Sequence, residues 1–301
     1  MSIYNNIDNS FLISTFFTEA IISLTIAGVE NPQVDARRLL AHVLQVTPQS
    51  LAIGNIGSGF LFCTEQQAAF TDLVVRRVRR EPVSRILGWR GFWTLELRLN
   101  TETFDPRPET ETVVETLLEH VVKRQAPYSL LDLGSGSGNL LLALLSELQN
   151  ATGVGVDIAA GAVSIARINA AAAGLATRAR FQVGNWGKGL SGVFDVIMAN
   201  PPYIAESDMC SLSPEVVHFD PPRALVGGSD GLAAYRAIAP SLTRLLSSQG
   251  VVALEIGQGQ ASAVKEMMKG NGLAFLDSRS DLSGITRCLL FCRADRSSHK
   301  T

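Results

Sequence analysis

The segment Asn200-Pro201-Pro202-Tyr203 combines residue types that are suited to holding a planar polar group. It follows an apolar run at residues 196–199, which is typical of a buried strand. Proline fixes φ and has no N–H donor, so two prolines give a rigid loop whose carbonyls are free for a ligand. We therefore expect Asn200, Pro201, Pro202 and Tyr203 to bind the substrate. A proline turn without chemical function is the alternative.

This loop has the groups needed to methylate an amide nitrogen. Such a nitrogen is a poor nucleophile because its lone pair is delocalised, so an enzyme must hold both N–H groups and favour tetrahedral geometry. The Asn200 side-chain oxygen and the Pro201 carbonyl are predicted to accept those hydrogen bonds, and Tyr203 to stack on the substrate. No general base is required, since the N-protonated product is a strong acid. Asn200, Pro201 and Tyr203 are thus the predicted catalytic residues.

A glycine-rich turn in residues 130–138 predicts a cofactor loop. An apolar strand leads into Gly134, Gly136 and Gly138, and an apolar helix follows. Glycine allows a sharp turn and close approach of the backbone to a ligand. Asp157 stands nineteen residues after Gly138, near the offset of about 20 at which an acidic side chain binds ribose hydroxyls. The pair indicates an adenosine-containing cofactor.

The alternating glycines differ from the dinucleotide pattern G-x-G-x-x-G, and no Lys-Ser/Thr ending of a P-loop follows them. The G-x-G-x-G form resembles the first motif of class I methyltransferases, which faces the amino-acid part of S-adenosyl-L-methionine. That resemblance makes S-adenosyl-L-methionine the expected cofactor.

Composition argues against several other classes of protein. The net charge of -2 and the pI near 6.1 give no basic field for a polyanion, so we expect no stable nucleic-acid binding. Four scattered cysteines form no CxxC pair, which predicts reduced structural cysteines and no metal site. The absence of about 18 consecutive uncharged apolar residues argues against a membrane span. We expect a cytoplasmic protein that needs no partner subunit.

Residues 1–85 are predicted to form a small helical substrate-docking domain, since apolar residues recur there at helical spacing. Arg76, Arg77, Arg79 and Arg80 form a basic cluster, which is either a solvated helix end or a docking patch for an acidic partner. Residues 86–108 are predicted to form a β-hairpin and a linker that is interrupted by prolines.

Residues 109–301 alternate between helix and strand signals, which predicts an α/β fold with a doubly wound, mostly parallel sheet. Strands are expected at residues 129–133, up to 157, 180–183, 194–199 and 251–256, and near 275 and 288. Helices are expected near residues 110–124, after 138, and at 160–173, 231–247 and 261–269. A ligand crevice is expected at the carboxyl ends of the strands.

Several further segments resemble the HemK/PrmC family, the peptide-chain release factor glutamine N5-methyltransferases. They include the linker Arg107-Pro108-Glu109-Thr110-Glu111 and the segments at residues 35–42, 86–88, 254–257 and 281–284. The resemblance implies a class I methyltransferase domain preceded by a helical domain that grips the release factor. The substrate would be the glutamine of a Gly-Gly-Gln loop.

The same resemblance implies the site residues. The implied cofactor-binding residues are Gly134, Ser135, Gly136, Ser137, Gly138, Asp157, Asn185, Trp186 and Asn200. Asn200 to Tyr203 match the glutamine-holding motif. Trp186 would cover the adenine ring, and a core aromatic is the alternative reading.

Two residues depart from the family pattern: Asp105 stands where an apolar residue is usual, and Asn185 stands where Asp is common. An amide still accepts a bond from an adenine amino group, so Asn185 bears on cofactor affinity. Glu109 and Glu111 are expected either to cap the following helix or to brace the site entrance.

Two other substrates keep the same reaction type. Ribosomal-protein glutamine methyltransferases share the Asn-Pro-Pro-Tyr motif, but their linker lacks the Pro-Glu-Thr-Glu run of residues 108–111. N6-adenine methylation of nucleic acid normally needs a basic groove, whereas residues 1–100 carry nine Lys/Arg against eight Asp/Glu. A non-catalytic binding module is a third alternative, which the intact glycines, Asp157 and Asn200 argue against.

Overall fold

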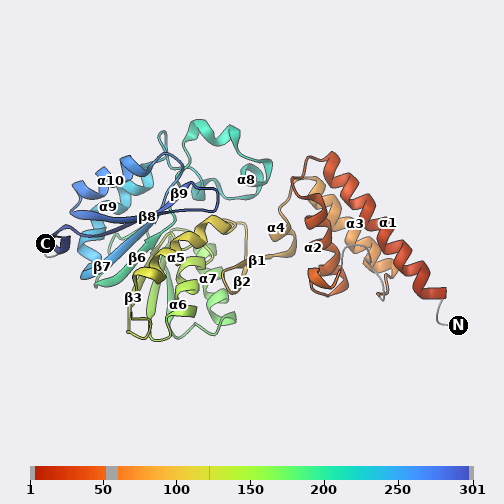
Figure 1. Ribbon diagram of the computed structural model, residues 1–301, viewed down its shortest axis with the longest axis horizontal. Helices are drawn as coiled ribbons and strands as arrows, with labels where there is room; N and C mark the ends of the chain where they lie inside the picture. Colours follow the sequence, from red (N-terminus) through yellow and green to blue (C-terminus); the bar gives the residue numbers. More distant parts are fainter. Residues whose placement is uncertain (1–3, 52–59, 122, 298–301) are drawn as a thin grey trace. The chain divides into compact units, whose positions relative to one another are not determined.

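The computed structural model describes residues 4–51, 60–121 and 123–297 of the chain (Figure 1). The chain divides into two compact units. Unit 1 comprises Met1–Gly88 and Pro214–Phe219, and unit 2 comprises Trp89–Ser213 and Asp220–Thr301.

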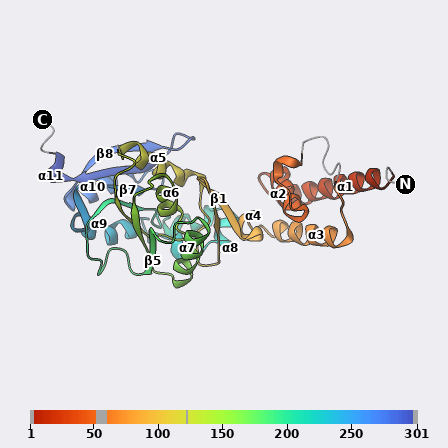
Figure 2. The same cartoon turned by 90° about the horizontal axis from the view of Figure 1, so that it is seen from below.

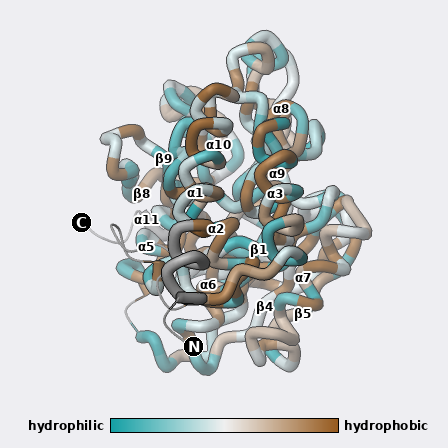
Figure 3. Tube along the Cα trace, turned by 90° about the vertical axis from the view of Figure 1, so that its right-hand side faces the viewer, coloured by the Kyte–Doolittle hydropathy of each residue, from teal (hydrophilic) through white to brown (hydrophobic). Residues whose placement is uncertain are grey.

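Unit 1 is helical. Its helices are α1 (Tyr4–Ile26), α2 (Pro32–Leu44), α3 (Thr64–Val78), α4 (Val83–Leu87) and α8 (Pro214–Phe219), with a 3-10 turn η1 (Pro48–Ser50). Hydrophobic and hydrophilic residues alternate along the helices in Figure 3, as expected when one face is buried. The buried face supplies a core that includes Ile13, Leu24, Leu39, Leu40 and Phe70. Helix α4 ends at Leu87 and is capped by Gly88, whose φ of 79° lies in the left-handed region.

Unit 2 contains a seven-stranded sheet in the order β5-β4-β3-β6-β7-β9-β8. The strands are β3 (Ser129–Leu133), β4 (Thr152–Asp157), β5 (Ala179–Val183), β6 (Phe194–Ala199), β7 (Leu246–Glu255), β8 (Leu273–Ser280) and β9 (Thr286–Arg293). The first five strands in this order pair in parallel, and β9 runs antiparallel to both β7 and β8. The predicted doubly wound, mostly parallel sheet is confirmed.

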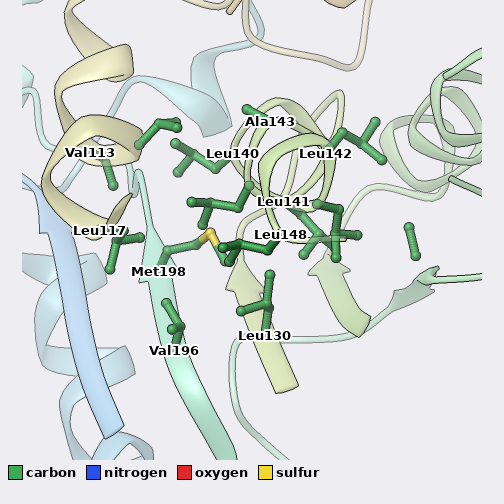
Figure 4. Packing of buried hydrophobic residues seen from close by; sticks show 14 of the residues in the cluster. Val113, Leu117, Leu130, Leu140, Leu141, Leu142, Ala143, Leu148, Val196 and Met198 are labelled. Carbon is green, nitrogen blue, oxygen red and sulfur yellow. The ribbon is translucent and has the colours of Figure 1, made fainter. Parts of the chain in front are cut away.

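Helices cover both faces of the sheet. On one face α5 (Glu111–His120), α6 (Asn139–Glu147) and α7 (Ala160–Ala172) pack on side chains such as Leu130 and Met198 (Figures 2 and 4). On the other face α9 (Ala233–Leu245) and α10 (Ala261–Gly270) pack on side chains such as Leu131 and Ile197. Leu130 and Leu131 lie on opposite faces because side chains alternate along a strand.

Strand β3 pairs with β4 on one side and with β6 on the other. The strand order reverses there, and such a switch point opens a crevice at the carboxyl ends of the strands. The loop after β3 contains Gly134 and the loop after β6 contains Asn200. The topology thus places both motifs at the same edge of the sheet.

The hairpin of β1 (Trp89–Phe92) and β2 (Leu95–Arg98) precedes the sheet. The indole N–H of Trp93 donates to Glu147 of α6 at 2.8 Å, which ties the hairpin turn to the sheet layer. Three 3-10 turns, η2 (Pro108–Thr110), η3 (Glu206–Ser211) and η4 (Pro222–Ala224), and a final helix α11 (Ala294–Ser297) complete the described elements.

The structure differs from the sequence prediction at two elements. Strand β7 begins at Leu246, where a helix was predicted, because Leu246 pairs with Phe194 of β6. This tertiary pairing overrides the local helical pattern. Helix α8 was not predicted at all, and it belongs to unit 1 although it lies far along the chain.

Candidate functional site

A cavity of about 290 Å³ lies at the carboxyl ends of β3, β4 and β6. Ten of the predicted site residues line it: Gly134, Gly136, Ser137, Asp157, Asn185, Trp186, Asn200, Pro201, Pro202 and Tyr203. The other two, Ser135 and Gly138, do not line it. Ser135 is buried beneath the loop, and Gly138 (φ 85°) forms the N-cap of α6.

The glycine loop leaves no room for a side chain at Gly134. Gly134 has φ of 79°, and a Cβ atom there would come within 3.0 Å of the Trp186 ring. A Cβ at Gly136 would meet open space, although its φ of 52° also favours glycine. Trp186 packs partly on the hydrophobic core and also lines the cavity. Its position is therefore compatible with both predicted roles, a core aromatic and a cover for the adenine ring.

Asp157 ends β4 and holds the glycine loop in place. One carboxylate oxygen accepts the backbone N–H of Gly136 at 2.8 Å, and the other accepts that of Ala159 at 2.9 Å. Since a carboxylate has about four acceptor positions, two remain available for hydroxyl groups of a ligand in the cavity. Ile158, which also lines the cavity, is well exposed and offers an apolar surface beside them.

Asp132 is an acidic residue for which no role was predicted. It lies in β3 below the glycine loop, is 1% exposed, and neither carboxyl oxygen has a hydrogen-bond partner among the described residues. Burial raises the pKa of Asp132 to about 7, the nearby backbone N–H of Leu141 lowers it, and the charge of Asp157 raises it further. A buried carboxyl without partners suits a cationic group nearby. Its only sequence signal is an acidic residue inside an apolar strand.

Asn200 is oriented by the linker. Its side-chain NH₂ donates to the hydroxyl of Thr110 at 3.1 Å. No hydrogen bond from the described residues reaches the Asn200 Oδ1 atom or the Pro201 carbonyl. Two acceptors on the wall of the cavity therefore remain free for a donor such as a substrate amide.

Tyr203 is held at both its side chain and its backbone. Its hydroxyl donates to Glu255 Oε1 at 3.4 Å, and its carbonyl accepts from Gln260 at 2.9 Å. Burial and the nearby charge of Glu255 raise the pKa of Tyr203, so the phenol remains protonated. The ring position is thus fixed from the strand end of β7 and from the start of α10.

Glu255 is almost completely buried at the end of β7, with 2% of its surface exposed. Burial raises its pKa to about 7, while the Thr110 hydroxyl, the charge of Arg287 and the Tyr203 hydroxyl lower it. The carboxyl therefore changes charge near neutral pH. The sequence alone gave no reason to link Glu255 with Asn200 or Tyr203.

Residues outside the two motifs complete the wall of the cavity. Glu102 and Arg223 both line the cavity and form an ion pair of 3.1 Å. Glu102 also accepts the backbone N–H of Gly161 at 3.2 Å. Phe104 lines the cavity too and lies 5.1 Å below the Arg107 guanidinium. These residues have no motif of their own, so only the fold reveals them.

The unusual Asp105 is accommodated by charge pairing. It is buried and accepts from Arg90 of the hairpin at 3.3 Å. Its backbone N–H donates to Asp220, which also accepts from Arg107 at 2.8 Å. The linker is therefore fixed by ionic contacts on both sides of Pro106.

Of the two roles considered for Glu111, a side-chain hydrogen bond that caps the helix is not present, although Glu111 lies in the first turn of α5. Thr110 occupies the N-cap position of α5, and no side-chain cap bond is present there. Glu111 instead accepts the backbone N–H of Trp93 at 2.8 Å, in the hairpin turn where Trp93 has φ of 56°. Glu109 lies close enough to Glu255 for its charge to raise the pKa of that carboxyl.

The arginine cluster of α3 is neither a fully solvated helix end nor a free basic patch. Arg77 is buried and pairs with Asp35 at 2.8 Å and with Glu215 at 2.9 Å. Arg80 pairs with the same Glu215 at 2.7 Å, and Arg76 pairs with Glu81. Only Arg79 remains exposed. The cluster is an internal ionic contact within unit 1.

The described residues contain neither a candidate metal site nor a candidate membrane-spanning helix. No group of three or more His, Cys, Asp or Glu side chains in residues 4–51, 60–121 and 123–297 has a metal-binding arrangement. In the same ranges, no helix is both long and apolar enough to span a membrane.

Comparison with known proteins agrees with this geometry. Residues 125–274 match the family model of a methyltransferase domain, and residues 16–88 match that of the PrmC N-terminal domain. The catalytic domain of hMettl16, solved with an RNA hairpin, matches with a TM-score of 0.55 over 84% of this chain and 90% of that chain. At 12% identity this match shows the fold alone.

Two curated relatives are much more similar in sequence. The release factor glutamine methyltransferase of Rhodospirillum rubrum is 48% identical, over 89% of this chain and 81% of the relative. That of Caulobacter vibrioides is 41% identical, over 91% of this chain and 94% of the relative. The chain therefore belongs to the release factor glutamine methyltransferase family.

Proposed function

We propose that this protein transfers a methyl group from S-adenosyl-L-methionine to the side-chain amide nitrogen N5 of the glutamine in the Gly-Gly-Gln motif of release factors. Membership of the family supports the substrate. The observation that carries the chemistry is Asn200, whose NH₂ is held by Thr110 while its oxygen stays free on the cavity wall.

The cofactor half of the cavity suits S-adenosyl-L-methionine, which supplies an electrophilic methyl group on a positively charged sulfur. Asp157 would accept the ribose hydroxyls with its two remaining acceptor positions, and Trp186 and Asn185 would bind the adenine. The open space at Gly136 and the unpartnered Asp132 carboxyl suit the cationic amino-acid end of the ligand.

The substrate half favours attack by an amide nitrogen. Asn200 Oδ1 and the Pro201 carbonyl would accept the two N–H bonds, which concentrates electron density on the nitrogen and holds it in line with the methyl group. Pro202 keeps the loop rigid and Tyr203 stacks on the amide plane. The C–S bond breaks as the C–N bond forms, and the extra proton on nitrogen leaves to water.

Two alternatives remain for the same site: the glutamine of a ribosomal protein and the amino group of adenine in nucleic acid. Thr110 belongs to the Pro-Glu-Thr-Glu run that separates the release-factor enzymes from the ribosomal-protein enzymes, and it contacts Asn200 directly. This contact favours the release factor. We also propose that the protein acts in the cytoplasm, without stable binding to nucleic acid and without a required second subunit.

The proposal is tested by presenting the alternatives side by side. Purified protein is incubated with S-adenosyl-L-methionine carrying a labelled methyl group and with a release factor, a glutamine-bearing ribosomal protein or an adenine-containing oligonucleotide. We expect label in the release factor, and none when its Gly-Gly-Gln glutamine is replaced by alanine. Preferential labelling of either other acceptor contradicts the proposal.

A further inference from the structure

The buried contacts around the Asn200 side chain form a connected set. Asn200 donates to Thr110 at 3.1 Å, and Tyr203 donates to Glu255 at 3.4 Å. Thr110 is fully buried and Glu255 is nearly so. The Thr110 hydroxyl lies close enough to the Glu255 carboxyl to lower its pKa, and the Oε2 atom of that carboxyl has no hydrogen-bond partner among the described residues. One carboxyl group therefore lies behind both side chains of the substrate loop.

A hydroxyl has a single proton, and the direction of that proton decides which end of Asn200 faces Thr110. When the proton is directed to the Glu255 carboxylate, the hydroxyl oxygen can only accept from Asn200. The NH₂ group must then face Thr110, and Oδ1 faces the cavity. If the Thr110 hydroxyl donated to Asn200 instead, the Asn200 amide would turn. Its Oδ1 atom would then accept from Thr110 and would no longer face the cavity.

We propose that Glu255 and Thr110 are positioning residues that set the direction of the Asn200 amide, so that its oxygen is presented to the substrate. This inference rests on the proposed function, and it adds two residues that do not touch the substrate. Glu255 acts on Asn200 through Thr110 and on Tyr203 directly.

The orientation of Asn200 is expected to depend on pH through the charge of Glu255. Charged and titratable groups face Glu255 from every neighbouring element: Glu109, Tyr203, Tyr235, Arg287 and Cys288. Burial, the largest effect, raises the pKa of Glu255 to about 7. Above this pH the carboxylate accepts from Thr110, and below it the protonated carboxyl can donate instead. The fraction of correctly oriented Asn200 therefore falls as pH falls through about 7.

The variants Thr110→Val, Thr110→Ser and Glu255→Gln test the proposal. Thr116→Val is the matched control, because Thr116 is a buried threonine on α5 whose hydroxyl donates to the Thr112 carbonyl away from the cavity. Under single-turnover conditions we expect methyl transfer to drop about ten-fold in Thr110→Val and Glu255→Gln, the value of one hydrogen bond. Thr110→Ser and Thr116→Val should keep most of the rate. Binding of S-adenosylhomocysteine should stay unchanged in all four variants.

A second measurement does not depend on activity. The side-chain NH₂ signal of Asn200 in ¹H–¹⁵N spectra should shift with a midpoint near pH 7, and Thr110→Val and Glu255→Gln should remove this midpoint. A midpoint that came from titration of Asp132 would remain in Thr110→Val and in Glu255→Gln. Loss of the midpoint in these variants therefore cannot be caused by Asp132.

The outcomes separate this inference from the proposed function. If the wild-type protein leaves the release factor unmethylated, the proposed function is wrong. The NH₂ signal of Asn200 still shows, independently of activity, which way the Asn200 amide is oriented. Normal methylation by wild type with an equal rate and an unchanged NH₂ midpoint in Thr110→Val overturns the positioning role.

Discussion

The Asn200 side chain has one polar atom bound to the protein and one that is free on the cavity wall. Its nitrogen is bound to Thr110, and its oxygen has no partner among the described residues. An acceptor that strengthens its bond as the substrate nitrogen gains positive character acts on the transition state more than on the bound substrate. The effect of changing it should therefore appear in turnover.

Asn200→Ala should lower kcat on the order of 100-fold, by analogy with removing one preorganised polar group from an active site. Cofactor affinity should fall less, because Asp157 and the glycine loop remain. Asn200→Asp keeps an acceptor oxygen and should retain clearly more activity than Asn200→Ala. Single-turnover methylation at saturating S-adenosyl-L-methionine measures this step, and equal rates for wild type and Asn200→Ala would remove Asn200 from the chemistry.

Asp157→Ala should weaken binding of S-adenosyl-L-methionine about ten-fold or more, since a charge-assisted hydrogen bond contributes roughly 1.5–3 kcal/mol. The same change removes the acceptor for the Gly136 N–H, so loop order should suffer as well. Asp277→Ala on the exposed face of β8 serves as the control and should leave affinity unchanged. Calorimetry decides between these results.

The residues with motif signals are also those that the fold brings to one cavity. The glycine loop and Asn200 follow neighbouring strands, so their proximity is predictable from the alternating pattern. Thr110 and Glu255 are different, because their contacts with Asn200 and Tyr203 span 90 and 52 residues of chain. Such partners are defined by the sheet order, which single-sequence patterns do not specify.

At the scale of elements, the loop after β3 determines the shape of the cofactor half of the cavity. Gly134 combines a left-handed φ with a close approach to Trp186. Gly174, after α7, has a similar φ of 70°, but a Cβ there meets nothing within 4 Å. A substitution at Gly174 therefore introduces backbone strain alone, whereas one at Gly134 introduces the same strain and a close contact with the Trp186 indole.

Gly134→Ala and Gly174→Ala should each lose about 1–2 kcal/mol of unfolding free energy, because a left-handed conformation costs an L-residue that much. Only Gly134→Ala should also weaken S-adenosyl-L-methionine binding, by several-fold, because its methyl group displaces the Trp186 ring. Denaturant unfolding and calorimetry give the two quantities. A similar loss of affinity in Gly174→Ala would show that strain alone is responsible.

Helix α8 is joined to α3 by a shared carboxylate. Burial raises the pKa of Glu215, but hydrogen bonds from Arg80 and Arg77 outweigh it and hold the pKa at about 2. Because the folded-state pKa lies below the unfolded value near 4.3, the stabilisation is present above about pH 4.3 and is lost as pH falls toward 2.

Glu215→Ala should destabilise unit 1 by about 3 kcal/mol near neutral pH, because it leaves two partly buried guanidinium groups without their carboxylate. Glu19→Ala, an exposed position on α1, should change stability by less than about 0.5 kcal/mol. Denaturant unfolding followed by hydrogen exchange in α3 measures both. An unchanged protection of α3 in Glu215→Ala would rule out the ionic contact as a stabilising element.

Sequence patterns predicted the elements that have a clear apolar periodicity and missed the one that is held by a distant contact. Helices such as α7 and α10 have clear apolar periodicity, and their expected ranges agree with the structure within one residue. Helix α8 has six residues, and its main anchor is Glu215, which is 138 residues from Arg77 in the chain. No local signal marks a contact of that kind.

For the whole molecule, the proposal of a protein substrate rests on family membership. The chain has a net charge of -2, and its arginine cluster on α3 is largely neutralised by internal acidic partners. The cavity of about 290 Å³ is lined by both motifs of the methyltransferase domain. This cavity is the place where we propose that the glutamine side chain enters.

The central claim is that the methyl group reaches the side-chain amide nitrogen of one glutamine. Tandem mass spectrometry of a release factor, digested after incubation with the protein and S-adenosyl-L-methionine, locates the methyl group by residue and by atom. We expect a single added methyl on the Gly-Gly-Gln glutamine, with fragments that assign it to N5, and none with Asn200→Ala at the same time point. A methyl group on any other residue would contradict this expectation. So would a glutamine that is still unmodified after an incubation long enough for many turnovers.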